Sequence, residues 1–129
     1  MRLTQLAACT GISGRRLRYV VDHDLVPALP AGGGGRGRSR DFTPFQAFTV
    51  AAAAQLLEAG ISRPMVCRIL LDLGGADKSR GRKSLWRVWN LDAKQPKHYL
   101  RANEAVSFWF EFGKLRDQIK ESVDGEGAA

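Results

Sequence analysis

The apolar residues at the start of the chain recur at helical spacing, and the repeat is broken once by a glycine-containing turn. A helix-forming run follows Thr4, and a second one begins at Gly14, after the break Gly11-Ile12-Ser13. Ser13 is of the residue type that caps a helix N-terminus. The spacing therefore predicts two short helices that cross about a tight turn, the sequence form of a helix-turn-helix. Their shared apolar positions are Leu3, Leu6, Ala7, Ile12, Leu17, Val20 and Val21.

Two more helices are predicted between residues 43 and 75. The run Thr43-Pro44-Phe45-Gln46 is a helix start, with an N-cap Thr, Pro at the first position and Gln where a capping box requires it. We expect this helix to end at Ala59-Gly60. Ser62 then caps the next helix, which Gly74-Gly75 ends.

The connection between these two pairs of helices is predicted to be extended. Leu25, Val26 and Leu29 indicate a short extended segment bounded by prolines. Residues 31–40 hold four successive glycines, whose backbone entropy opposes a helix. We therefore expect a long, glycine-rich loop here.

The last third of the chain predicts a hairpin and a final helix. Residues 84–91 alternate polar and apolar side chains of β-favouring types, which predicts a strand. Residues 98–100 are expected to pair back on it. Asn103 is the expected cap of a helix over residues 104–123, followed by a frayed tail at 124–129.

The predicted final helix carries an apolar seam. Ala105 and four further residues follow 3–4–3–4 spacing, which is typical of a coiled coil. The four residues expected at a homodimer interface are Phe108, Phe112, Leu115 and Ile119. Aromatic residues are concentrated in this third of the chain, and three interpretations stay open: a small core, a dimer interface, or a pocket for an aromatic effector. We favour core plus interface, since a hairpin and a lone helix need a partner to bury so much surface.

Charge adds a second pattern. The chain has 129 residues, with 20 Lys and Arg against 13 Asp and Glu, a net charge of +7. Basic residues dominate 1–42 and 63–101, whereas 102–129 is net acidic. Such an excess attracts polyanions. No apolar run suits a membrane span or a secretory signal, and Cys9 and Cys67 suggest reduced thiols, so the expected location is the cytoplasm.

The order of the first elements resembles the winged-helix DNA-binding domain of the MerR family of bacterial transcription regulators. The resemblance covers residues 2–73, a little over half of the chain. Its motifs are Leu6-Ala7, Thr10-Gly11-Ile12-Ser13, Leu17-Arg18-Tyr19, Leu25-Val26-Pro27, Arg40-Asp41-Phe42-Thr43 and Leu56 to Ser62. It implies a mostly α fold, with a winged helix-turn-helix head at 1–73. A basic linker at 74–83, and the hairpin and C-terminal dimerisation helix at 84–123, would follow.

The second predicted helix carries the residue types that read DNA. Arg15 and Arg18 are three positions apart and share a face, and Arg16 is offset from them by about 100°. One arginine can pair with guanine through two hydrogen bonds while its neighbours neutralise phosphates. Ser13 belongs to the same predicted DNA-contact set. The resemblance places Arg18 and Tyr19 at backbone contacts; alternatively, Tyr19 packs beneath the wing and the arginines are only solvated.

Two further basic segments extend the predicted DNA contacts. In an extended wing the alternating Arg36, Arg38 and Arg40 point the same way, towards phosphates or a minor groove. A disordered, solubilising loop is the alternative. The second segment holds Lys78, Arg80, Arg82 and Lys83, and a solvated linker is an equally good interpretation of it.

Catalysis, cofactors and metals find little support in the sequence. His23 and His98 have no neighbouring nucleophile or paired carboxylate, and no metal-ligand cluster is present. We therefore predict a non-enzymatic, sequence-specific regulator that binds double-stranded DNA as a homodimer on a palindromic site, with any effector unidentified. The alternatives are an excisionase-like or architectural DNA-bending protein and, third, a basic protein-interaction module.

Overall fold

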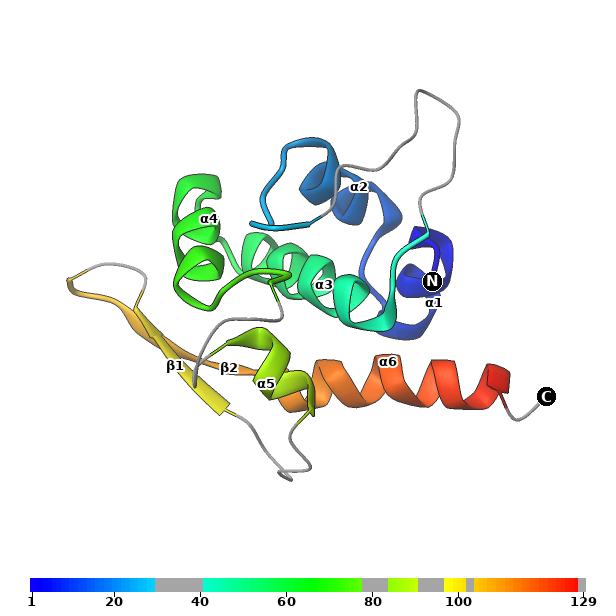
Figure 1. Ribbon diagram of the computed structural model, residues 1–129. Coiled ribbons are helices and arrows are strands. Elements are labelled where there is room, and N and C mark those ends of the chain that lie inside the picture. The colour runs from blue at the N-terminus through cyan, green and yellow to red at the C-terminus, as the bar shows by residue number, and fades with distance from the viewer. Residues whose placement is uncertain (30–40, 78–83, 91–96, 102–103, 128–129) are drawn as a thin grey trace.

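Helices dominate the part of the chain that the computed structural model describes, residues 1–29, 41–77, 84–90, 97–101 and 104–127 (Figure 1). A two-stranded antiparallel sheet is its other regular element. The elements in chain order are α1 (Leu3–Thr10), α2 (Gly14–Asp22), α3 (Pro44–Glu58), α4 (Arg63–Asp72), α5 (Leu85–Asn90), β1 (Lys97–Arg101), β2 (Ser107–Glu111) and α6 (Phe112–Gly127). The prediction of a mostly helical fold is confirmed.

The first four predicted helices are all present, and local capping fixes two of their starts. Ser13 Oγ accepts a hydrogen bond from the Arg16 backbone N–H at 3.2 Å. Thr43 Oγ1 accepts from the Gln46 N–H at 3.1 Å, and the Gln46 side chain accepts from the Thr43 N–H at 3.0 Å. This is the predicted capping box, and it satisfies two backbone donors that a helix N-terminus leaves open.

The predicted extended segment over Leu25, Val26 and Leu29 is wrong, because residues 25–29 form turns. Asp24 and Ala28 take left-handed conformations, with φ of 51° and 63°. The Leu29 N–H donates to the Val26 carbonyl at 3.4 Å, which closes a turn. The predicted wing at 31–40 lies outside the described residues.

The predicted strand over residues 84–91 is also wrong: this segment contains helix α5. Leu85, Val88 and Trp89 are buried, at the i, i+3, i+4 spacing of one helix face. Ser84 Oγ accepts from the Arg87 N–H at 3.2 Å, and the Ser84 carbonyl accepts from the Val88 N–H at 3.1 Å. Capping by serine and burial of this face favour the helix over the alternating pattern.

The hairpin therefore forms between strands other than the predicted pair. The predicted strand at 98–100 lies in β1, which pairs with β2 in the register Tyr99↔Trp109. The predicted helix over 104–123 is wrong at both ends, because α6 begins only at Phe112 and continues to Gly127, into the tail expected to be frayed at 124–129. Ser107 to Glu111 hold three successive aromatic residues, which favour the pleated surface of a sheet.

Helix α3 lies at the centre of the fold, and almost all of its length is buried. Its middle is the run Ala51 to Ala54, whose side chains are all fully buried. Small side chains let neighbouring elements approach on every side, so a helix that is apolar all round becomes the core. α1 and α2 pack on α3, as do α4, α5 and α6. Figure 1 shows α2 above α3 and α6 below it.

The seam predicted as a dimer interface is instead part of this core. Phe112, Leu115 and Ile119 are at most 1% exposed within the single chain, and Phe108, on β2, is half-buried. The Phe112 ring lies 6.2 Å from that of Phe48 on α3 and 4.2 Å from that of Phe110. Because the hairpin turns α6 back against α1 and α3, a dimer of this fold needs another surface.

We expect Phe112→Ala to lower the free energy of unfolding by about 3–5 kcal/mol, the usual cost of removing a buried phenyl ring. Urea unfolding at several protein concentrations measures it. The loss should be independent of concentration, because the ring packs within one chain. The exposed Glu121→Ala on the same helix is the control. A loss that disappears at high protein concentration would restore the dimer seam.

The segment after α4 is held tightly against the head. The Gly75 N–H donates to the Leu70 carbonyl, and the Ala76 N–H donates to the Pro27 carbonyl, both at 2.8 Å. Gly75 has a φ of 52°, and a Cβ there would lie 2.2 Å from the Pro27 carbonyl oxygen. Only glycine fits this close approach.

Gly75→Ala should therefore be more destabilising than Gly60→Ala. Gly60 also has a positive φ, 92°, but a Cβ there meets nothing within 4 Å. The control should cost only left-handed strain, about 1–2 kcal/mol. The steric overlap at Gly75 should lower the free energy of unfolding by roughly a further 1–3 kcal/mol, the usual cost of overpacking. Equal thermal midpoints for the two variants would contradict the contact with Pro27.

Candidate nucleic-acid interface

Helix α2 has one buried and one exposed side. Leu17, Val20 and Val21 are at most 3% exposed and attach the helix to the core. On the other side, Arg15 and Arg18 are exposed, whereas Arg16 is half-buried at the edge of the two sides. The burial of the apolar residues thus fixes which way the arginines face.

The N-terminus of α2 adds partial positive charge to the same surface. Gly11, with φ 76°, and the buried Ile12 form a three-residue turn with Ser13, which places the start of α2 directly after α1. Ser13 is exposed and uses its hydroxyl as the cap. A helix N-terminus attracts anions through its dipole and its open N–H groups. With Arg15 beside it, this end of α2 is suited to a phosphate.

Tyr19 lies at the other end of α2 and is 38% exposed. Its ring stacks on that of His23, with centroids 4.0 Å apart and an interplanar angle of 27°. His23 Nδ1 also lies 3.0 Å from the Tyr19 carbonyl oxygen, as a cap of the helix end. The sequence shows no catalytic partner for His23, and its i, i+4 spacing from Tyr19 is the signal that pairs the two rings on one helix face.

The other predicted DNA-contact residues lie outside the described part of the chain. They are Arg36, Arg38, Arg40, Lys78, Arg80, Arg82 and Lys83. Their described flanks are nevertheless informative. The hydrogen bond from Ala76 to Pro27 lies within two residues of both Leu29 and Asp77, the last described residues before each basic segment. The described residues that precede the two basic segments therefore lie close together.

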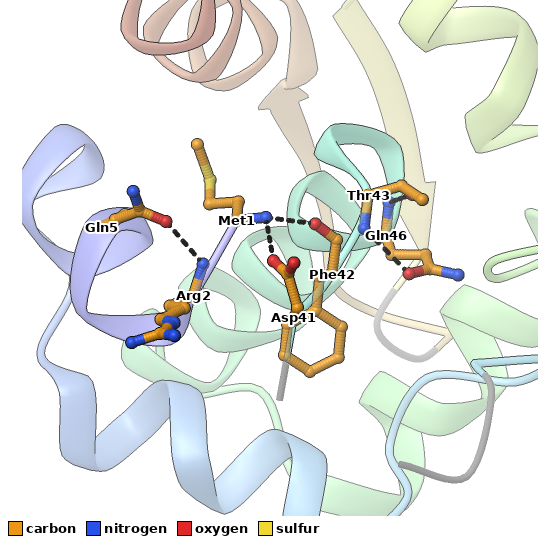
Figure 2. A network of polar contacts seen from close by, with 7 residues as sticks. All are labelled: Met1, Arg2, Gln5, Asp41, Phe42, Thr43 and Gln46. Atoms are coloured by element: carbon orange, nitrogen blue, oxygen red, sulfur yellow. Dashed lines mark hydrogen bonds and ion pairs between the residues drawn. The ribbon is translucent and has the colours of Figure 1, made fainter. Parts of the chain in front are cut away.

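Asp41 and Phe42, the first described residues after the first basic segment, are held by the chain's N-terminus (Figure 2). The Met1 ammonium donates to Asp41 Oδ1 at 2.7 Å and to the Phe42 carbonyl, and the Phe42 N–H donates to the Met1 carbonyl at 2.8 Å. Phe42 itself is buried. The hydrogen bond and the charge of the ammonium, helped by Arg2, hold the pKa of Asp41 below its ordinary value of 3.8.

We expect the ion pair at Asp41 to give a pH-dependent share of stability. Because the pKa of Asp41 is lowered in the folded state, that share is fully present above pH 3.8 and is lost as the pH falls through the folded pKa. The difference in urea midpoint between the wild type and Asp41→Asn should therefore be positive at neutral pH and shrink in acid.

Asp41 is exposed, so solvent screens the pair and the effect should be small. The exposed Asp72→Asn on α4 is the matched control. A wild-type advantage over Asp41→Asn that persists unchanged below pH 3.8 would contradict the ion pair.

Two other kinds of site can be assessed on the described residues. No three His, Cys, Asp or Glu side chains of the described ranges gather into a set that could hold a metal ion. Among the helices in the same ranges, none has the length and apolar character needed to cross a membrane.

Comparison of the chain with models of known families, with curated proteins and with solved structures finds no match. The residues themselves, and the surface that α2 presents, are therefore what indicates a function.

Proposed function

We propose that this chain binds double-stranded DNA through α2 and acts as a sequence-specific transcription regulator. One observation carries the proposal: α2 is seated by Leu17, Val20 and Val21, so its arginine face is directed to solvent. The helix follows α1 after a three-residue turn, an arrangement that suits a recognition helix. The motifs resembling MerR regulators lie over the same residues.

The geometry suits the major groove. Nine residues at about 1.5 Å each make α2 roughly 13 Å long, enough to lie along a few base pairs. In the proposed complex Arg15 or Arg18 pairs with a guanine edge, and the other arginines neutralise phosphates. In the proposed complex the stacked Tyr19 and His23, at the end of the helix, contact the sugar-phosphate backbone.

The basic segments at 36–40 and 78–83 complete the proposed contact set. Their charges supply sequence-independent attraction to phosphate, which makes binding steeply salt-dependent. A homodimer would place two copies of α2 in successive major grooves of a palindrome. We propose the bacterial cytoplasm as the site of action, in keeping with the regulator family that the head resembles.

The test is selection from a random duplex pool, followed by titration of the best duplex at two salt concentrations. Replacing Arg15, Arg16 and Arg18 together by Ala should lower affinity for that duplex at least a hundredfold, since a bidentate base contact alone is worth about 1–3 kcal/mol. The control replaces the exposed Arg63, Arg68 and Arg87 by Ala, which removes the same charge from α4 and α5. It should weaken binding much less.

Arg18→Lys and Arg15→Lys sharpen the test, because lysine keeps the charge but loses the two-pronged hydrogen bond. Specificity should fall while affinity for random DNA is retained. Equal binding to every duplex would contradict a sequence-reading role and favour an architectural one. Absence of binding at low salt would reject DNA as the partner.

A further inference from the structure

A groove lies where the end of α3, strand β2 and the first turns of α6 meet. Its volume is about 890 Å³, and its lining includes Glu58, Trp109, Glu111 and Lys114. Glu58 is the last residue of α3, and Lys114 lies in the first turn of α6. In Figure 1, α6 lies on the opposite side of α3 from α2. The groove is thus built from elements other than the proposed DNA-binding helix.

The groove exposes a large aromatic side chain. Trp109 is 63% exposed, although Phe110 beside it is buried at 9%. Successive side chains of a strand point to opposite faces, so Phe110 on β2 lies in the core whereas Trp109 is exposed to solvent. Val106, just before the strand, is 49% exposed. Exposed tryptophans are enriched at the centres of protein–protein interfaces, where their burial supplies much of the affinity.

The charges of the groove are of both signs. Glu58 and Lys114 both line it, and neither takes part in an ion pair within the described ranges. The C-terminal carbonyls of α3 add partial negative charge beside Glu58. Because Glu58 and Glu111 outnumber Lys114 in the lining, a nucleic acid would be repelled here.

A surface that carries an exposed aromatic residue with charges of both signs is complementary to itself. In a two-fold dimer every contact between two different residues occurs twice. A Lys of the first protomer that faces a Glu of the second therefore implies a second, identical Lys–Glu pair. The apolar seam of α6 is occupied within the chain, as Phe112 and Leu115 show. The groove, by contrast, exposes its aromatic residue and both of its charge signs, so it can meet the same surface of a second copy.

We propose that a second copy of this chain docks on this groove across a two-fold axis, with Trp109 of each protomer buried in the other and Lys114 paired with the partner's Glu58. This pairing extends the proposed function, because it names the surface through which two protomers would associate to bind one palindromic DNA site. Its biological purpose rests on DNA binding, but its measurement needs no DNA.

Charge exchange between two variants tests the pairing directly. Lys114→Glu and Glu58→Lys are each examined alone, and then as an equimolar mixture, by sedimentation velocity of the full chain without DNA. The wild type should show a concentration-dependent monomer–dimer equilibrium. Each variant alone should associate at least tenfold more weakly, because both of its Lys–Glu pairs become like-charged pairs.

The mixture should recover wild-type association. In that heterodimer one protomer brings two acidic residues and the other two basic residues, so both pairs are again of opposite sign. Matched controls reverse the charge of exposed residues elsewhere, with Arg68→Glu on α4 and Glu121→Lys late in α6. These should leave association unchanged. Trp109→Ala should also weaken it, with the far-UV circular dichroism as the check that the fold persists.

Three results would overturn the proposal. They are a monomeric wild type at every concentration, a dimer indifferent to Lys114→Glu and Glu58→Lys, and a mixture that associates no better than its components. The outcome is separable from that for DNA binding. Loss of DNA binding with an intact dimer counts against the proposed function alone, and a monomer that still binds single half-sites counts against the dimer alone.

Discussion

The burial of most of α3 is the constraint on which the rest of the structure depends. Ten of its fifteen residues are buried, and its middle is four fully buried alanines. Most of its surface must therefore be covered, and α1, α2, α4, α5 and α6 all pack against it. The alanines gain little free energy individually, but they let backbones come close. The larger Phe45, Phe48 and Leu56 then fill the space between the helices.

Placement of the arginine face of α2 follows from the same constraint. Leu17, Val20 and Val21 are buried on α2, which packs against α3. Rotation of α2 about its axis would expose them. Burying one such side chain is worth about 1.5–3 kcal/mol, so the orientation is strongly fixed. Arg15 and Arg18 are thus positioned by the packing of their neighbours rather than by contacts of their own. A rigid presentation of this kind lowers the entropy that a recognition helix loses on binding.

The sequence predicts the head well and the C-terminal third poorly, for reasons visible in particular residues. Ser13, the Thr43–Gln46 box and Gly11 are local signals, whose meaning depends on the nearest few residues. By contrast, residues 84–91 include β-favouring types, yet Leu85, Val88 and Trp89 share one helix face, and α5 buries that face and packs on α3. The seam residues Phe112, Leu115 and Ile119 were correctly identified as apolar, but periodicity does not say which chain covers them. The two basic segments have no apolar periodicity from which packing could be predicted, so only their composition and charge could be interpreted.

The head and the C-terminal third share one core, so the stability of each depends on the other. Phe48 of α3 contacts Trp89 at 5.3 Å and Phe112 at 6.2 Å between ring centroids, so the C-terminal third covers what the head alone would expose. A head without α5 and α6 would present these rings to water, and exposed aromatic surface of that kind drives aggregation. The C-terminal third therefore has a structural role before it has any role in association. The outward face of β2, where Trp109 is exposed, is a part of this third that a partner can cover without loosening the core that holds α2 in place.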